Sequence, residues 1–322
     1  MSFKFYLFLI AAFILLALVA VSSGGASISL GDIVKFFTFG ELDETKELIL
    51  TQMRLPRLVL GILIGALLAT SGVVVQSVFL NPLADPYIIG IASAATFGAV
   101  IAYLLGLSDV FYGIFAFLSA SALSIVIFKL AAHTRSISTL LIVGIAVSSF
   151  LGAFTSFAVY LIGEDSFRIT AWMMGYLGGA NWQKIALLLP PLLFCMAYFY
   201  AKRHELNIIL NGDEEAKSLG LNVEKSKKSL LIVSSLIIGF SVAFTGMIGF
   251  VGLIIPHTLR MALHTASNAV LIPASALTGG VFLVFCDVIA KNALSPVEIP
   301  IGVVTSFFGA PFFLYLAFRK HA

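Results

Sequence analysis

Charged residues are scarce in this sequence. Only 11% of its 322 residues are Asp, Glu, Lys or Arg, whereas 60% are hydrophobic. A soluble domain has about 25% charged residues, so this composition excludes an ordinary water-exposed surface. The mean hydropathy is +1.07 and long apolar runs recur along the chain, which indicates a polytopic membrane protein. The net charge of +3 is too small to suggest nucleic acid as a partner.

Cysteine and the common catalytic motifs are also lacking. The two cysteines, Cys195 and Cys286, lie in apolar runs, where free thiols behave as small buried hydrophobes. Neither H-E-x-x-H nor G-x-x-x-x-G-K-[ST] is present. Lys217-Ser218 comes nearest to the second motif, but Asn211 and Ala216 occupy its glycine positions. We therefore expect no catalytic residue, no metal site and no cofactor in this chain, so that ATP and Mg²⁺, if used, bind to a partner.

Ionisable side chains are nearly absent from the middle of the apolar runs, where Gln76 is one of the few strongly polar residues. An ion-coupled secondary transporter would need an intramembrane carboxylate or an unwound ion site. A multi-span membrane enzyme would need His, Asp or Glu clustered near the interface. The sequence offers neither, but both classes remain alternatives to a transporter driven by a separate ATPase.

Nine apolar runs are candidates for helices that cross about 30 Å of hydrocarbon, which takes about 20 residues. The first run has 17 residues, more than the usual signal-peptide core of roughly 7–15, so we expect a retained span. The runs are 5–21, 58–80, 87–107, 110–132, 140–162, 185–201, 229–259, 270–290 and 301–318.

The run 229–259 has 31 residues, too many for one span and few for two. The positive-inside rule places Lys4, a polar segment at 202–228 and Arg319-Lys320 in the cytoplasm. Six spans precede the polar segment, and only four following spans return the C-terminus to the same side. We therefore expect a break near 245–249, about ten spans and cytoplasmic termini, with 12 of the 19 Lys and Arg inside. A re-entrant hairpin in place of two short spans stays open.

The polar segment 202–228 contains one predicted short helix, Gly212 to Gly220. Asp213, Glu214 and Glu215 lie in its first turn, where carboxylates complement the helix dipole, and Gly220 is placed for a left-handed C-cap. A helix of about two turns is unstable alone in water. We expect neighbouring elements to hold it and another protein to contact it.

Two arginines, Arg54 and Arg57, stand at the outer end of the second span. Such side chains usually extend to lipid headgroups, but they could also form an exposed pair for carboxylates of a partner. Lys291, at the outer end of a later span, could join them. Asp287 lies four residues before Lys291 on the same helix face, so an ion pair within that helix is the simpler expectation.

Six motifs, in order from about Arg54 to the C-terminus, give the chain a recognisable pattern. This pattern resembles the FecCD-type permeases of ABC importers, which move iron–siderophore complexes, haem and cobalamin across the bacterial inner membrane. The motifs are R-L-P-R at 54–57, G-A-L-L-A-T-S-G-V-V-V-Q at 65–76, N-P-L-A-D-P at 81–86, G-D-E-E-A-K-S-L-G at 212–220, G-F-V-G-L-I-I-P-H-T-L-R at 249–260, and E-I-P-I-G-V-V-T with G-A-P-F-F-L-Y-L between 298 and 316.

The resemblance implies a fold and a set of partners. The expected fold is all-α, a type II-like ABC importer permease with ten helices, and residues 1–322 form a single transmembrane domain with a coupling loop at about 202–228. The expected partners are a second permease subunit, identical or closely related, two cytoplasmic ATPases and a periplasmic binding protein. The permease itself is then not an enzyme, because ATP is hydrolysed in the ATPase subunits.

The resemblance also assigns residues by position. Lys291 stands where the family often has Arg, and Lys lacks the bidentate fork of a guanidinium. The implied ATPase-coupling residues are Gly212, Asp213, Glu214, Glu215, Ala216, Leu219 and Gly220; the implied binding-protein docking residues are Arg54, Arg57 and Lys291; and the implied cytoplasmic gate contains Ser136, Ser138 and Thr139.

The cargo is expected to be a metal chelate. An iron–siderophore complex is favoured only because it is the commonest cargo of the family. Haem and cobalamin are the alternatives with the same mechanism, and molybdate is a minority alternative.

Overall fold

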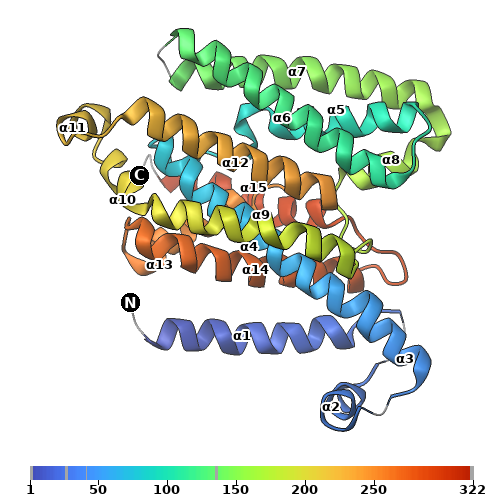
Figure 1. Cartoon of the computed structure of the whole chain (residues 1–322). Helices are drawn as coiled ribbons and strands as arrows, with labels where there is room; N and C mark the ends of the chain where they lie inside the picture. Colours follow the sequence, from blue (N-terminus) through green and yellow to red (C-terminus); the bar gives the residue numbers. More distant parts are fainter. Residues whose placement is uncertain (1–2, 26–27, 41, 135–136, 320–322) are drawn as a thin grey trace.

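Helices make up all the secondary structure of the described residues, which are 3–25, 28–40, 42–134 and 137–319 of this computed structural model. The long helices lie side by side in one bundle (Figure 1). They are α1 (Phe3–Ser22), α4 (Leu55–Val78), α5 (Ile91–Leu104), α6 (Asp109–Thr134), α7 (Ile137–Ile162), α9 (Trp182–Ala201), α12 (Val223–Thr245), α13 (Val251–Leu263), α14 (Asn268–Asn292) and α15 (Ile301–Arg319).

Short helical segments connect the long helices. At one end of the bundle lie α2 (Leu30–Phe39), α3 (Glu44–Leu48), η1 (Ile49–Arg54), η3 (Gly163–Ser166) and α8 (Phe167–Met173). At the other end lie α10 (Arg203–Ile209) and α11 (Asp213–Ser218), while η2 (Pro86–Ile89) precedes α5. We call the two ends the α8 end and the α11 end.

Six helices in the described chain are long and apolar enough to cross a membrane: those containing α4, α6, α7, α9, α12 and α14. Apolar helices of 10–17 residues occur within α1, α5, α13 and α15. These positions match the expected runs. However, the 13 residues of α13 extend only about 20 Å at 1.5 Å per residue, less than the hydrocarbon thickness. The count of ten complete spans therefore stays a prediction.

The predicted break in the 229–259 run is confirmed, because α12 ends at Thr245 and α13 begins at Val251. Gly246 starts the break with a φ of 68°, and a Cβ there would lie 1.9 Å from the carbonyl oxygen of Trp172. The N–H of Tyr176 donates to the carbonyl of Thr245 over 2.8 Å. The break is thus held by backbone contacts with α8 and with the segment that follows it.

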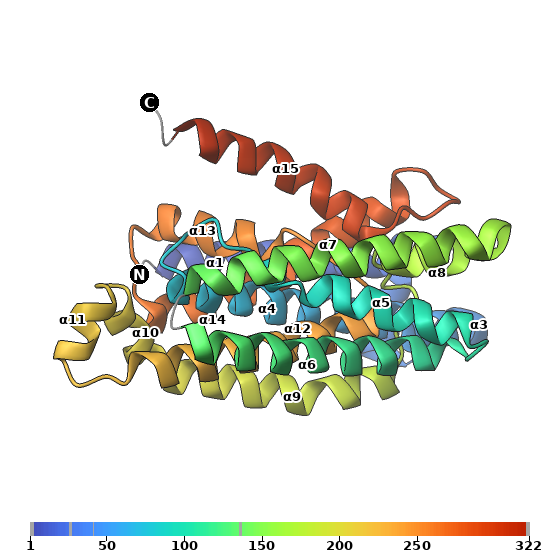
Figure 2. The same cartoon turned by 90° about the horizontal axis from the view of Figure 1, so that it is seen from above.

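The structure places both ends of the described chain and the polar segment at the same end of the bundle, as the parity of the spans predicts, while the side of the membrane that this end faces stays a prediction. The start of α1, the end of α15 and the helices α10 and α11 all lie at the α11 end (Figures 1 and 2). An even number of crossings on each side of the polar segment requires this arrangement.

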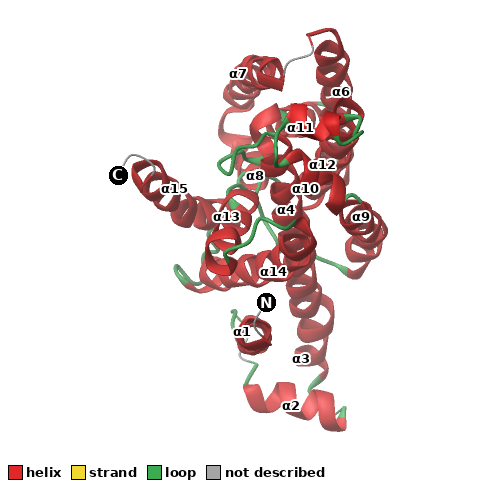
Figure 3. Ribbon diagram, turned by 90° about the vertical axis from the view of Figure 1, so that its left-hand side faces the viewer, coloured by secondary structure: helices red, strands yellow, loops and turns green. Residues whose placement is uncertain are grey.

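The central helix is α4, which has the most buried window of the six candidate spans. Figure 3 looks onto the α11 end and shows α4 in the middle of the bundle. A Cβ on Gly65 would lie 2.3 Å from the carbonyl oxygen of Gly279, and a Cβ on Gly72 would lie 1.9 Å from that of Gly252. Glycines therefore let the backbones of α14 and α13 touch α4 directly.

Gly65→Ala should lower the free energy of unfolding by about 1–3 kcal/mol, because the added methyl group overlaps backbone that cannot rotate away. Gly152→Ala in α7 is the matched control, since a Cβ there meets no atom within 4 Å. The control should be neutral or stabilising by about 0.5–1 kcal/mol. Thermal unfolding of both variants in one detergent checks this, and equal melting temperatures would contradict the backbone contact.

Candidate functional site

The short helix α11 is held in place by its own termini and by one buried side chain. Gly212 and Gly220 flank it with φ values of 106° and 83°, which confirms the left-handed conformation predicted for Gly220. The N–H of Gly220 donates to the carbonyl of Lys217 and that of Leu221 to the carbonyl of Ala216, the Schellman pattern that satisfies helix-terminal carbonyls. Ala216 is fully buried and faces the bundle.

Two ionic contacts fasten this helix to its neighbours. Lys227 of α12, which is only 5% exposed, places its Nζ 2.6 Å from Oδ1 of Asp213. Glu205 of α10 accepts hydrogen bonds from Lys202 and from Ser226 of α12. Burial alone would raise the pKa of Glu205, but these two donors together hold it below its ordinary value of 4.5. The elements α10, α11 and α12 therefore form one braced unit.

The outward side of α11 is exposed. Leu219 is 65% exposed although it is apolar, and Glu214 pairs with the neighbouring Lys217 over 3.0 Å. Of the predicted coupling residues, Ala216 anchors the helix, Gly212 and Gly220 shape its ends, and Asp213 is half-exposed beside Lys227. The exposed positions are Glu214, Glu215, Lys217, Ser218, Leu219 and Gly220.

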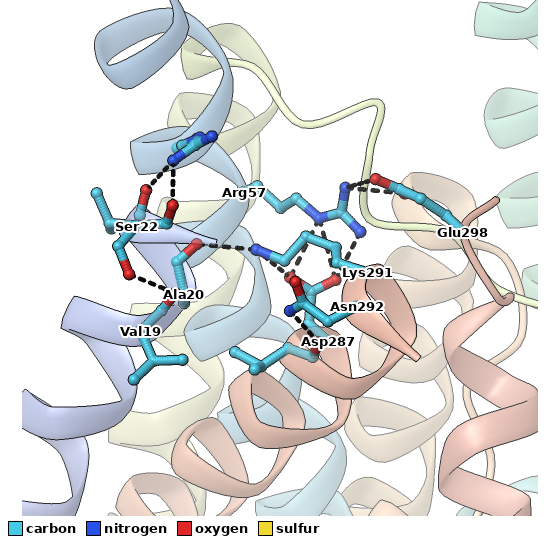
Figure 4. Close-up of polar contacts among 11 residues, drawn as sticks. Val19, Ala20, Ser22, Arg57, Asp287, Lys291, Asn292 and Glu298 are labelled. Atoms are coloured by element: carbon cyan, nitrogen blue, oxygen red, sulfur yellow. Dashed lines mark hydrogen bonds and ion pairs between the residues drawn. The ribbon is translucent and has the colours of Figure 1, made fainter. Parts of the chain in front are cut away.

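The predicted docking arginine Arg57 is engaged within the chain at the α8 end (Figure 4). Its Nη2 lies 2.8 Å from Oδ1 of Asp287, and its Nε donates to Oδ2 of the same carboxylate over 3.1 Å. Its Nη1 lies 2.9 Å from Oε1 of Glu298. Sequence reasoning did not find these two partners of Arg57, which lie more than 200 residues away, although Glu298 belongs to a quoted motif.

Arg54 and Lys291 bind the end of α1. Arg54 donates to the carbonyls of Val21 and Ser22, and Lys291 donates to the carbonyl of Ala20 over 2.9 Å (Figure 4). The last carbonyls of a helix have no intrahelical donor, and cations there also complement the dipole. Lys291 lies 3.4 Å from Asp287, so the ion pair predicted within that helix is confirmed. A docking role for the three cations stays a prediction.

The predicted gate falls mostly outside the described part of the chain. Ser136 is not among the described residues, and Ser138 and Thr139 belong to the first turn of α7, where only the backbone is described.

A cavity of about 860 Å³ opens beside α13 and α15. Its lining is mostly apolar, with Met174, Met247, Phe250 and Phe307 contributing large side chains, and includes Asp85. Asp85 accepts a 2.7 Å hydrogen bond from the N–H of Tyr87 and so caps η2. Residues 81–86 thus form a turn capped by the side chains of Asn81 and Asp85. No sequence pattern pointed to this cavity, because its walls come from four separate segments.

The whole chain, with both ends and the cavity, is similar to known permeases. The pattern of the FecCD transport family matches residues 10–319. The chain belongs to the FecCD transport family. A cobalamin import permease of Halobacterium salinarum is 43% identical over 278 residues, which cover 85% of this chain and 74% of the relative. A hemin transport permease of Yersinia pestis is 35% identical over 327 residues, which cover 97% and 95%.

A solved structure supports the same assignment. It is described as an inward-facing conformation of a proposed metal-chelate type ABC transporter, with a TM-score of 0.87, 30% identity and coverage of 98% of this chain and 99% of that one. The FecCD resemblance and the all-α class are confirmed, and this FecCD permease is a multi-pass membrane subunit of the ABC importer type.

Glu205→Gln should loosen α10 and α11 in the FecCD permease. Because its pKa is lowered in the folded chain, Glu205 contributes stability that is present above pH 4.5 and is lost as the pH falls below that value. Hydrogen exchange in α10 and α11 should be roughly fivefold faster in the variant at pH 7. This factor corresponds to the loss of about 1 kcal/mol, the contribution of a partly exposed charged hydrogen bond. Exposed Glu215→Gln is the control and should exchange like the wild type.

Asp287→Asn should lower the free energy of unfolding by about 3–5 kcal/mol, because it leaves the half-buried Arg57 and the buried Lys291 without their shared carboxylate. Glu298→Gln removes a carboxylate that is 35% exposed and should cost at most about 1 kcal/mol. Thermal unfolding in detergent checks both variants. A larger loss in Glu298→Gln than in Asp287→Asn would contradict the dominance of the buried pair.

Proposed function

We propose that this permease is the membrane subunit of a binding-protein-dependent ABC importer in the bacterial inner membrane. Two cytoplasmic ATPases cover the α11 end, a periplasmic binding protein docks at the α8 end, and a second permease subunit completes the pathway. The observation that carries the proposal is α11, a braced helix with an exposed apolar and acidic face, in a chain that lacks a phosphate-binding loop.

The braced unit supports a coupling role. A partner that moves α11 also moves the first turns of α12, because Asp213 is bound to the buried Lys227. Helix α12 then runs as one rigid element of 23 residues to the break at Gly246. Met247, next to that break, lines the 860 Å³ cavity. A push at α11 is therefore transmitted to the cavity wall as a rigid-body motion, the kind of shear that packed helices permit.

The apolar surface beside the cavity supports a second subunit. Figure 3 shows α7 and α15 on the same side of the bundle, and the later part of α15 diverges from its neighbours in Figure 2. The apolar window of α7 is only 17% buried, and Phe307 of α15 is 79% exposed. A second copy, or a close paralogue, placed against these helices would close the cavity into a pathway between the subunits.

A carboxylate-bearing protein can dock at the α8 end only if its carboxylate replaces one that is already bound to Arg57. Glu298 is the more exposed carboxylate bound to Arg57, so an acidic residue of the binding protein would replace Glu298 while Asp287 keeps its bidentate contact. Arg54 and Lys291 would contribute charge while they remain bound to α1.

The cargo that we propose is a metal chelate. We rank a metal-bearing tetrapyrrole ahead of the iron–siderophore complex favoured by family frequency. What supports this ranking is that the relatives named above are a cobalamin and a hemin permease. The cavity lining, with large apolar side chains and little charge, suits a large ligand that must pass without being held tightly.

Transport by the complete complex in lipid vesicles tests the function. Cobalamin, haem and a ferric siderophore are offered in turn, with and without ATP, and we expect ATP-dependent accumulation of one of them. Accumulation that needs no ATPase subunit and stops when the proton gradient is dissipated would instead establish an ion-coupled secondary transporter.

Glu214→Lys combined with Leu219→Asp should uncouple the two reactions, because it reverses the charge and removes the apolar contact on the exposed face of α11. We expect transport to fall at least about tenfold while ATP hydrolysis continues. A factor of ten corresponds to the loss of one interface contact worth about 1.4 kcal/mol. Transport and ATPase rates are measured in the same vesicles.

Two controls accompany this variant. The permease should keep its melting temperature, because neither side chain is buried. Glu44→Lys with Leu48→Asp changes exposed residues of the same types in α3 and should leave the ratio of transport to hydrolysis unchanged. Unimpaired transport in the α11 variant would remove the coupling role.

A further inference from the structure

A second polar feature lies beside α11 at the same end of the bundle. Arg260, near the end of α13, lines an open pocket of about 380 Å³ together with Asn81, Asn211 and Gly212. We call it the Arg260 pocket. Gly212 is the N-cap of α11, so the pocket and the proposed coupling surface share a wall.

A buried glutamine orients the guanidinium of Arg260. Gln76 is only 2% exposed, and its Nε2 donates to the carbonyls of Gly252 over 3.2 Å and Leu253 over 3.3 Å. Both amide hydrogens are thereby directed to the backbone of α13, which turns Oε1 toward Arg260. Nη1 of Arg260 donates to that oxygen. The glutamine thus fixes the position of the cation without neutralising it.

The charge of Arg260 is uncompensated within the described chain. A guanidinium has five N–H donors, and its one hydrogen-bond acceptor among the residues at 3–25, 28–40, 42–134 and 137–319 is the neutral Gln76. No carboxylate of those residues lies within 4 Å of it, and no acidic residue lines the pocket. Asp213, which adjoins Gly212, is bound by Lys227 instead. A half-buried cation of this kind is costly unless an anion completes the site.

The place of the pocket in the bundle indicates which anion. The elements around it, α4, α10 and α13, lie in the middle of the α11 end, whereas α1, α6, α7, α9 and α15 surround them (Figure 3). A phospholipid would reach the periphery of this end more readily than its centre. A protein seated on α11 covers the centre.

We propose that the Arg260 pocket accepts the carboxylate of an Asp or Glu side chain from the protein that covers α11. This inference rests on the proposed function, in which that protein is the ATPase subunit. The planar fork of Arg260 suits bidentate binding of a carboxylate, and Asn81 and Asn211 provide further amide groups at the pocket wall. The pocket supplies a fixed ionic contact next to the exposed face of α11.

The affinity of the purified ABC ATPase of the same import system for the full-length permease tests the proposal. The permease is held in nanodiscs of neutral lipid, and the affinity is measured at low and at high salt. Arg260→Gln should weaken binding about thirtyfold or more, as expected when one partner of a buried charge pair is removed. Arg260→Lys should weaken it less, because the charge stays and only the fork is lost. Arg203→Gln removes the same charge at the same end, outside the pocket, and should bind like the wild type.

The controls separate this site from a structural role and from a lipid site. If Arg260 served only to hold Gln76, Arg260→Gln and Arg260→Lys would reduce the affinity for the ATPase equally at every salt concentration. Both variants would then also have a lower melting temperature. That result would overturn the proposal. So would unchanged ATPase affinity in Arg260→Gln together with reduced retention of phosphatidylglycerol in native mass spectrometry. If the wild-type permease itself fails to bind the ATPase, the proposed function falls as well, whereas equal affinity of wild type and Arg260→Gln removes this inference alone.

Discussion

Direct backbone contact around α4 is the constraint on which the rest of the structure depends. Gly65 meets Gly279 of α14, and Gly72 meets Gly252 of α13. Apolar side chains gain little by leaving lipid, so close approach of small residues has to hold membrane helices together. Because α13 is pressed against α4 at this point, Gln76 reaches the carbonyls of Gly252 and Leu253. The position of Arg260, about two turns later in α13, follows from that contact.

The polar groups at the two ends of the bundle differ in how their charges are balanced. At the α8 end, two cations, Arg57 and Lys291, are matched by two carboxylates, Asp287 and Glu298, in one compact cluster. Lys291 also binds α1 through the carbonyl of Ala20. At the α11 end, Glu205 and Lys227 brace the short helix, but Arg260 is oriented by a neutral side chain. A matched cluster stabilises this chain by itself, whereas an oriented and unmatched cation is prepared for a partner.

The break between α12 and α13 links these ends to the cavity. A continuous helix over 229–259 would have crossed the bilayer and placed the G-F-V-G-L-I-I-P-H-T-L-R motif outside it. The positive φ of Gly246 and its contact with Trp172 of α8 stop α12 after 23 residues instead. The short α13 then returns toward the α11 end, so one polypeptide segment contributes both to the cavity wall, through Phe250 and Leu253, and to the Arg260 pocket.

The sequence by itself determined the features that depend on neighbours within a few residues. Apolar runs located the helices, charge counting required the break, and Gly212 to Gly220 specified a capped helix, because period, capping and dipole effects act over one or two turns. Only the tertiary structure decided which distant groups meet. Arg57 and Asp287 are 230 residues apart, and Gln76 and Arg260 are 184 apart. Such pairs depend on how helices pack, and packing is set by the shape of whole surfaces, which no local pattern encodes.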